Sequence, residues 1–371
     1  MKDAGEGRLA SIDVARALGL MLVYYGHFVE QIMYLKNPAA AVQYKWIYSF
    51  HMILFFVLSG WVRGARPVTP PVRQFVKSTL ASRIVPYLFF SLLLACLSFF
   101  IPGWFPLVDL STAKGYFMAA VSMALGFPLL NVPLWFVACL VSVECVHRLA
   151  QGFLGSAPRI LLAALICYIG GYALNEQYFF FGQGKSFWLL HEVPVVYAFY
   201  LVGVLLGRSR AVSRVSTGGS VAIFVLALVC VQLTFDLNQG PFRYLQAVII
   251  LLSGHGHFLW FPFTALAGTA FVLALGHVLR HVWPLAFLGR NALILLGMNG
   301  VFYHFINPVV AKWSVAVLPG DGWSVFLIST LVTVISIGLC VPVIMALNAA
   351  VPQLVGKPRQ AGRWFGPLVR E

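Results

Sequence analysis

The chain has 371 residues, of which 60% are hydrophobic and only 10% charged, and its formal net charge is +14. Soluble globular proteins carry roughly 25% charged residues, so this composition excludes an ordinary water-soluble domain and indicates a protein that is solvated by lipid. The excess of basic residues does not predict nucleic-acid binding, because basic residues of membrane proteins gather in cytoplasmic loops and set the orientation.

Ten apolar runs approach the length of about 20 residues that a helix needs to cross a bilayer. We predict membrane-spanning helices over residues 12–34, 46–62, 84–101, 132–148, 159–175, 191–207, 219–235, 258–279, 284–306 and 323–347. Two further stretches, 116–130 and 242–254, contain the interruptions Gly126-Phe127-Pro128 and Ser253-Gly254, which are typical of re-entrant or interfacial segments. No domain boundary is visible, so residues 1–371 are expected to form one transmembrane domain.

The distribution of Lys and Arg predicts the orientation of these helices. With the N-terminus inside, 18 of the 25 basic residues fall in inner loops and tails, six fall in outer loops, and Arg16 lies within the first span. This asymmetry follows the positive-inside rule, and a wrong number of spans would scramble it. We therefore predict an all-α integral membrane protein with about ten transmembrane helices and with both N- and C-termini cytoplasmic.

The first span carries four ionisable residues, Asp13, Arg16, His27 and Glu30, although each costs roughly 2.5–3.5 kcal/mol on insertion scales. Arg16 and His27 are eleven residues apart, so they lie on one face of the helix about three turns, or roughly 16 Å, from each other. One interpretation is structural: Arg16 snorkels and pairs with Asp13, and His27 is a hydrogen-bonded core residue. The other is a functional site along this face.

Two more histidines favour the functional interpretation. His51 lies near the outer start of the second span and His304 near the outer end of the ninth. Counted along the helices, His27, His51 and His304 all fall roughly 20–24 Å from the inner edge, which is more typical of a site than of three independent core residues. Glu144, in the inner half of the fourth span, is a candidate partner for Arg16, either as a structural ion pair or in catalysis.

The histidine and cysteine spacings of the sequence do not indicate a metal site or a redox site. His255-Gly256-His257 has a spacing seen at metal sites, but a third ligand is lacking, so no metal is expected. The six cysteines all fall in apolar stretches without any CxxC pair, and we interpret them as small buried hydrophobic residues.

The chain resembles the membrane acyltransferases of family 3 in an ordered series of short motifs. That family is marked by a basic residue, ten residues and a histidine in its first helix, as in Arg16 and His27 here. The likeness continues at Ser49-Phe50-His51-Met52, Phe55-Phe56-Val57-Leu58-Ser59-Gly60, Ser82-Arg83-Ile84-Val85-Pro86-Tyr87, Pro133-Leu134-Trp135-Phe136, Phe199-Tyr200-Leu201-Val202-Gly203, Leu288-Gly289-Arg290-Asn291 and Tyr303-His304. The ninth-span segment is most similar to the branch that acetylates sugars, such as fucose-4-O-acetylase-like and exopolysaccharide acetyltransferases, but Asn291-Ala292 stands where the family usually has a hydroxylated residue.

The resemblance implies transfer of an acetyl group from cytoplasmic acetyl-CoA to a sugar hydroxyl of a surface or exported polysaccharide, or of its lipid-linked precursor, at a bacterial inner membrane. His27, Glu30 and His304 would be catalytic. His27 would be the general base, since a histidine with a pKa near 6.5 can take a proton near neutral pH. The pantetheine arm of CoA is about as long as the separation of Arg16 and His27.

The resemblance also implies how the substrates are held. Arg16, Asp13 and Arg83 would bind CoA, and the Arg16 guanidinium could hold a phosphate with two donors. His51 and Trp135 would position the substrates. The expected partners are thus acetyl-CoA, a carbohydrate acceptor and the lipid bilayer, and no nucleic acid.

A transporter or flippase for a sugar-bearing lipid is the alternative, because it would also use intramembrane Arg, His and Glu residues. Transporters often show paired repeats with matched broken helices, and this sequence contains no internal repeat. The acyltransferase is therefore the favoured hypothesis.

The predicted topology can be tested with reporter fusions. Fusions after Lys36 and Lys185 should report an external position, and fusions after Arg73 and Arg214 a cytoplasmic one, because the basic loops stay inside. A cytoplasmic signal from the Lys185 fusion would contradict the arrangement of spans.

Overall fold

The computed structural model describes residues 2–66, 70–177, 187–209, 215–239 and 247–369, with side chains from residue 10 onward. Within these ranges the regular structure is helical and no strand is present. The first half contains α1 (Lys2–Tyr34), α2 (Pro38–Tyr48), α3 (His51–Gly64), α4 (Val72–Thr79), η1 (Leu80–Ile84), α5 (Val85–Phe100), α6 (Ala113–Ala124), η2 (Val132–Leu134), α7 (Trp135–Ala150) and α8 (Ala157–Gln177). The second half contains η3 (Phe187–Leu189), α10 (Val193–Arg208), α11 (Thr217–Thr234), η5 (Ile250–Leu252), α12 (Trp260–Val278), α13 (Trp283–Arg290), α14 (Ala292–Val301), η6 (Phe302–Ile306), α15 (Asn307–Val317), α16 (Gly322–Ala350) and η7 (Pro352–Val355).

Length and hydropathy identify the helices that can cross a membrane. In the described part of the chain, nine helical stretches are long and apolar enough, and α10 is a shorter apolar helix. The nine are Ala10–Tyr34, Pro38–Gly64, Val72–Phe100, Val132–Ala150, Ala157–Asn175, Thr217–Thr234, Trp260–Val278, Ala292–Val317 and Gly322–Ala350. They confirm the predicted all-α membrane fold of about ten helices, while the cytoplasmic position of the termini stays a prediction.

Three spans differ clearly from the expected ones. The third begins at Val72 rather than at residue 84, because α4 and η1 continue into α5. The other two contain backbone breaks that hydropathy does not reveal. The second is longer than 46–62 and is divided between α2 and α3, so that His51 is the first residue of a new helix. The ninth was expected over 284–306. Instead, α13 ends at Arg290, and the spanning stretch begins at Ala292 and continues to Val317. His304 therefore lies near the middle of this stretch rather than at its outer end.

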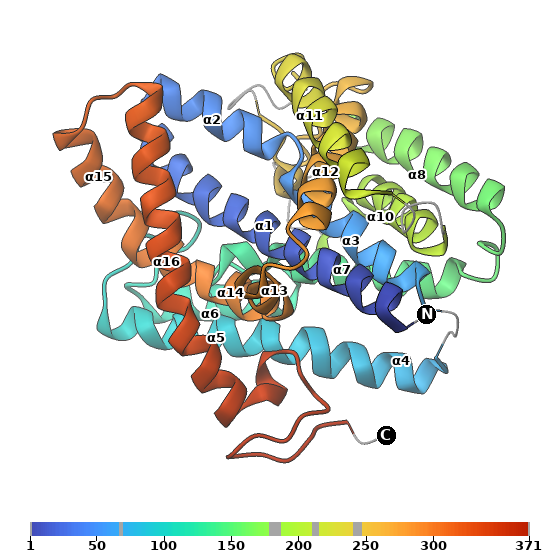
Figure 1. Cartoon of the computed structure of the whole chain (residues 1–371). Helices are drawn as coiled ribbons and strands as arrows, with labels where there is room; N and C mark the ends of the chain where they lie inside the picture. The colour runs from blue at the N-terminus through green and yellow to red at the C-terminus, as the bar shows by residue number, and fades with distance from the viewer. Residues whose placement is uncertain (1, 67–69, 178–186, 210–214, 240–246, 370–371) are drawn as a thin grey trace.

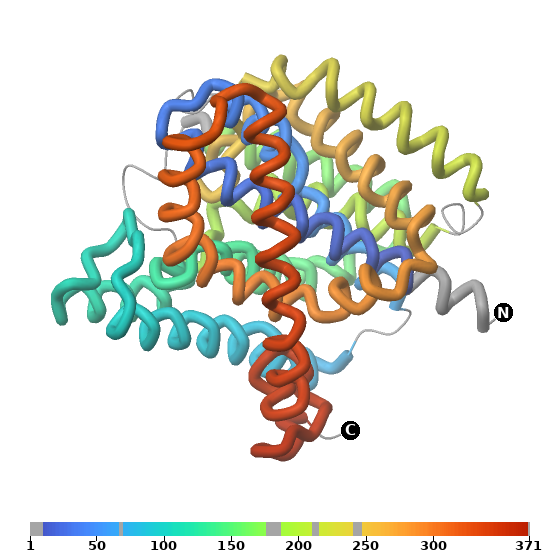
Figure 2. The backbone as a smooth tube through the Cα atoms, turned by 60° about the vertical axis from the view of Figure 1, so that its left-hand side comes forward, coloured from blue at the N-terminus to red at the C-terminus, as the bar shows by residue number. Residues whose placement is uncertain are grey.

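The first helix occupies the centre of the bundle. It packs against α2, α3, α12, α13, α14, α15 and α16, and in Figures 1 and 2 it crosses the middle of the molecule. A helix at the surface of the bundle has one side in contact with lipid. By contrast, other helices enclose α1 along most of its length. This position shields its ionisable side chains from lipid, where each would be costly.

Small residues bring α3 and α10 into close contact. A Cβ atom added at Gly60 would overlap the carbonyl oxygen of Tyr200, and one added at Gly203 would overlap that of Val57. Each glycine is the first of a pair four residues apart, which is the spacing that lets helix backbones approach in membranes. This interface anchors α3, which begins with His51.

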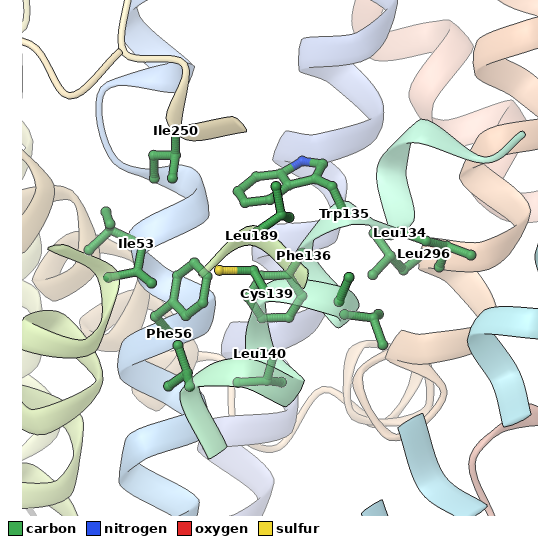
Figure 3. Close-up of a cluster of buried hydrophobic side chains, with 14 of the residues drawn as sticks. Ile53, Phe56, Leu134, Trp135, Phe136, Cys139, Leu140, Leu189, Ile250 and Leu296 are labelled. Atoms are coloured by element: carbon green, nitrogen blue, oxygen red, sulfur yellow. The ribbon is translucent and has the colours of Figure 1, made fainter. Parts of the chain in front are cut away.

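The largest buried cluster joins α3 and α7 to two loops. Figure 3 shows Trp135 and Phe136 of α7 near Phe56 of α3, with Leu189 and Ile250 contributed by separate irregular segments. All five side chains are at most 8% exposed. The cluster therefore fixes α7 relative to α3 through apolar packing.

Neither interrupted stretch of the sequence forms a spanning helix. Residues 116–130 comprise most of α6, which ends at Ala124, and a buried irregular turn. Residues 242–246 lie outside the described ranges, and 247–254 form an irregular buried segment around η5. Glu192, which is fully buried, holds this segment by accepting hydrogen bonds from the backbone N and Oγ of Ser253, at 3.0 and 2.9 Å.

The α3–α10 contact predicts a position-specific effect of adding one methyl group. Gly203→Ala should lower the free energy of unfolding by about 1–3 kcal/mol, because the new Cβ forces the two backbones apart. Gly170→Ala is the matched control, since no atom lies within 4 Å of its added Cβ. Thermal unfolding of the two purified variants checks this, and equal midpoints would contradict the tight interface.

Candidate active site

Two adjoining cavities open at one end of the bundle, and together we call them the basic cavity. Their volumes are about 650 and 290 Å³, and both are lined by Arg16 and Arg83. The larger one is strongly cationic, with Glu144 as its single carboxylate among the described lining residues. Its cationic side chains are Arg16, Arg63, Arg66, Arg83, Arg148, Lys357 and Arg359. Such an excess of positive charge suits a polyanionic ligand.

Arg83 enters the basic cavity from a π-helical turn. η1 spans Leu80–Ile84, and Pro86 follows two residues later. A proline lacks the N–H that the carbonyl of Ser82, four residues earlier, would otherwise accept. Such loss of an intrahelical bond is a recognised cause of local helix distortion, and π-turns occur often at functional sites.

The ionisable groups of this region form two short ion pairs. Nη1 of Arg16 lies 3.1 Å from Oδ1 of Asp13 on the same helix. Nη2 of Arg83 lies 3.0 Å from Oε1 of Glu144. Glu144 thus pairs with Arg83, and the sequence-based pairing of Glu144 with Arg16 is not formed. Arg16 has one carboxylate neighbour and still faces the cavity, so its remaining donors are available to a ligand.

The C-terminal segment closes one side of the basic cavity. Gly356 turns the chain with a positive φ of 93°, and Lys357 then donates from Nζ to Oδ1 of Asn291 at 2.7 Å. Partial burial and the nearby Arg290 guanidinium hold the pKa of Lys357 below its ordinary value. An anion bound here would offset the repulsion between these two cations.

The smaller cavity leads from Arg16 toward the centre of the bundle. It follows Leu20 and Val23 along α1 and has apolar walls that include Phe55 and Phe136. Residues 16, 20 and 23 lie on one helical face, and the next residue on that face is 27. The cavity therefore points along α1 from the cationic end toward His27.

Each of the three histidines that the sequence assigned to the site makes a hydrogen bond through its ring atom Nδ1. His51 Nδ1 lies 2.9 Å from the carbonyl oxygen of Ile47, and His304 Nδ1 lies 2.7 Å from that of Trp104. Because a carbonyl can only accept, both rings carry the proton on Nδ1 and leave Nε2 as an acceptor. His51 and His304 are each 1% exposed, whereas His27 is partly exposed.

The His27 imidazole lies close enough to those of His51 and His304 that a positive charge on His27 would repel a charge on either ring. Its ring centroid is 4.9 Å from that of Tyr303, which is in turn 4.9 Å from that of His304. On the other side, Tyr48 contacts the His51 ring at 4.6 Å. The structure therefore brings His27, His51 and His304 into one histidine cluster lined by aromatic rings.

His304 owes its environment to a second π-helical turn. η6 spans Phe302–Ile306, and Pro308 follows two residues later. Because residue 308 has no N–H, the carbonyl oxygen of His304 is free to accept from the backbone N of Trp104, at 2.7 Å. Trp104 thus binds His304 through both its N–H and its carbonyl group, and Nε2 of His304 stays buried without a partner.

Glu30 lies in the same region but is bonded to tyrosines. It accepts hydrogen bonds from the hydroxyl groups of Tyr34 at 2.8 Å and of Tyr48 at 3.4 Å. Its side chain is 7% exposed. Glu30 therefore shapes the aromatic wall of the histidine cluster, and the bonded partner of His27 is a residue of another helix, Asn299.

The remaining candidates from the sequence lie elsewhere. Trp135 belongs to the hydrophobic cluster of Figure 3, where its ring contacts that of Phe136. His255 is bonded to Glu192 at 2.7 Å, whereas Nδ1 of His257 accepts from the backbone N of Leu259. Among the described residues, no group of three His, Cys, Asp or Glu is arranged to hold a metal ion.

Sequence reasoning missed several residues that the structure places in these sites. Asn299 and Trp104 contact the histidine cluster, and Lys357 lines the basic cavity. Asn299 could have been noticed as an amide within an apolar span, since polar residues there usually bond across helices. Lys357 was counted only as a topological charge, and nothing in the sequence relates Trp104 to His304.

A multi-pass helical bundle in which a cationic cavity points toward a buried histidine cluster defines a membrane protein with an enzyme-like site. The family model for the acyltransferase domain of family 3 matches residues 9–345. The chain therefore belongs to acyltransferase family 3 and is a membrane acyltransferase. No curated protein and no solved structure matches it.

Proposed function

We propose that this protein is an O-acetyltransferase that moves an acetyl group from cytoplasmic acetyl-CoA to a sugar hydroxyl. The acceptor is a surface or exported polysaccharide, or its lipid-linked precursor, and the membrane is a bacterial inner membrane. The observation that carries the proposal is the alignment of Arg16, Leu20, Val23 and His27 on one face of α1, with the first three lining a continuous cavity.

The larger part of the basic cavity is the proposed site of the CoA nucleotide. Phosphates are best held by guanidinium groups, which present paired donors, and arginines dominate this cavity. The smaller cavity has apolar walls and leads along α1, which suits a thin, mostly uncharged pantetheine arm. The acetyl thioester then lies toward His27, with the cationic end of the bundle in the cytoplasm.

The proposed reaction is a single acyl transfer at His27. Nε2 of His27 takes the proton from the acceptor hydroxyl as its oxygen attacks the thioester carbonyl carbon. The C–S bond breaks, the thiolate of CoA leaves, and the imidazolium returns its proton to the sulfur. His51 and His304 present two further Nε2 acceptors near this centre and would orient the acceptor, with Glu30 holding the surrounding tyrosines.

The donor site predicts that Arg16 determines CoA affinity. Arg16→Ala should weaken CoA binding at least about tenfold, because a charge-assisted hydrogen bond is lost. Arg16→Lys should also bind more weakly, since an ammonium lacks the planar pair of donors. Titration calorimetry on the purified variants measures both.

The matched control for the Arg16 variants is Arg159→Ala. Arg159 is an exposed arginine of α8 and lines neither part of the basic cavity. Its removal should leave CoA affinity unchanged. If Arg16→Ala bound CoA as tightly as the parent, Arg16 would be a structural residue.

The catalytic role predicts that His27→Ala lowers acetyl transfer by about 10²–10⁴-fold, the usual contribution of a general base. CoA affinity should be kept, because the base lies beyond the donor cavity. Transfer of labelled acetyl groups to candidate glycans and CoA binding are measured on the same purified sample. His281→Ala, a change at an exposed histidine, is the control.

Two outcomes would contradict this assignment. Near-parental turnover of His27→Ala would exclude His27 as the base, even if the protein is an acetyltransferase. Absence of acetyl transfer by the folded parent protein with every glycan, together with movement of a glycolipid in vesicles, would favour a flippase.

A further inference from the structure

Asn299 makes a direct hydrogen bond with the proposed base. Oδ1 of Asn299 lies 2.5 Å from Nδ1 of His27. Asn299 belongs to α14 and is 0% exposed, whereas His27 belongs to α1 and is partly exposed. The bond therefore connects a residue that is partly exposed to a side chain that is completely enclosed by protein.

A second bond between the same two helices sets the register of this contact. The hydroxyl group of Tyr24 donates to the carbonyl oxygen of Leu295 at 2.7 Å. Tyr24 precedes His27 by about one turn, and Leu295 precedes Asn299 by about one turn. The two bonds thus form successive contacts along α1 and α14, so the fold delivers Asn299 to the His27 ring at a fixed height.

The atom that faces the ring determines which nitrogen can act as a base. An amide oxygen only accepts, so the contact requires a proton on Nδ1 of His27 and leaves Nε2 unprotonated. If the amide nitrogen donated to Nδ1 instead, the ring proton would lie on Nε2, and Nε2 could not accept a proton. The orientation of Asn299 and the basicity of Nε2 are therefore coupled.

The other end of the amide does not hold the side chain, so the bond to His27 is its one polar contact within the described structure. Nδ2 of Asn299 is buried and makes no hydrogen bond within the described structure. By contrast, Asn291 uses both ends, donating to the carbonyl of Phe287 and accepting from Lys357 and Asn348. Burying an unpaired donor costs stability, and such uncompensated polar groups need an explanation.

We propose that Asn299 is the positioning residue of the active site, holding His27 in the tautomer whose Nε2 is the general base. The proposal rests on the proposed role of His27. Asn299 does not touch the reacting atoms. It acts through the imidazole, in the way that a buried acceptor fixes the histidine of other acyl-transfer sites.

The titratable groups around the His27 ring do not provide an alternative acceptor for Nδ1. Glu30, on the same helix, is bonded to Tyr34 and Tyr48. Tyr303 contacts the ring in a tilted arrangement, with 4.9 Å between the centroids and 56° between the ring planes. His51 and His304 both use Nδ1 on backbone carbonyls.

Three substitutions separate positioning from packing. Asn299→Leu has a similar volume but offers no acceptor, so kcat should fall by between about tenfold and the 10²–10⁴-fold expected for loss of the base, with an unchanged KM for acetyl-CoA. Asn299→Asp keeps the acceptor and should retain turnover at a pH above the acid limb of its own profile. Thr333→Val removes a buried hydroxyl that bonds within α16 and should leave kcat unchanged.

The aspartate variant should also change the pH dependence. A carboxylate beside the ring favours the imidazolium, so His27 would lose its proton at higher pH. The acid limb of the kcat profile should therefore move upward by about one to three pH units. An unmoved acid limb in the folded Asn299→Asp variant would mean that the side chain of residue 299 does not act on the base.

The tautomer is also measured without turnover. The ¹⁵N chemical shifts of the imidazole nitrogens in histidine-labelled protein distinguish a protonated from an unprotonated nitrogen, and the His27→Gln variant assigns the His27 signals. We expect a protonated Nδ1 in the parent protein and in Asn299→Asp, and a mixture of tautomers in Asn299→Leu.

Each result decides the proposal. A protonated Nε2 in the resting parent, parental kcat in Asn299→Leu, or a folded and CoA-binding Asn299→Asp that is inactive at every pH of the profile would overturn it. If the parent protein transferred no acetyl group, the proposed function would fail, and the ¹⁵N signals would still show whether Asn299 fixes the ring.

Discussion

The enclosure of α1 is the constraint on which the rest of the structure depends. An arginine and a histidine three turns apart on a membrane-spanning helix cannot face lipid without a large cost, so other helices must cover that helix on nearly every side. Once α1 is central, its polar face becomes a path through the protein: Arg16 lines the basic cavity, Leu20 and Val23 line its narrow continuation, and His27 follows on the same face.

A π-helical turn next to a proline lies at each end of this path. Each is followed two residues later by a proline, Pro86 after η1 and Pro308 after η6. The missing N–H interrupts the regular hydrogen-bond pattern, and each turn carries one site residue, Arg83 or His304. At the second turn the freed carbonyl is used by Trp104, which ties an otherwise separate loop to the histidine cluster.

The two ends also differ in polarity in a way that suits their separate roles. The basic cavity contains many cations and few carboxylates, and the C-terminal segment adds Lys357 and Arg359 to it. The histidine cluster contains neutral bases surrounded by aromatic rings and tyrosine hydroxyls. A polyanionic donor would thus be attracted to one end, while proton transfer would take place in a partly water-excluded environment at the other.

Composition and the apolar runs of the sequence were sufficient for the membrane class and the approximate number of spans, and helix geometry was sufficient for the face of α1 that holds Arg16 and His27. Those properties are local, because a helix has a fixed rise and twist per residue. The sequence did not indicate the break before Ala292, the pairing of Glu144 with Arg83, or the contacts of Asn299 and Trp104 with the histidines. Only the tertiary structure decided these. The three contacts each join residues more than 60 positions apart through helix packing, and packing depends on the shapes of many side chains at once rather than on any local pattern.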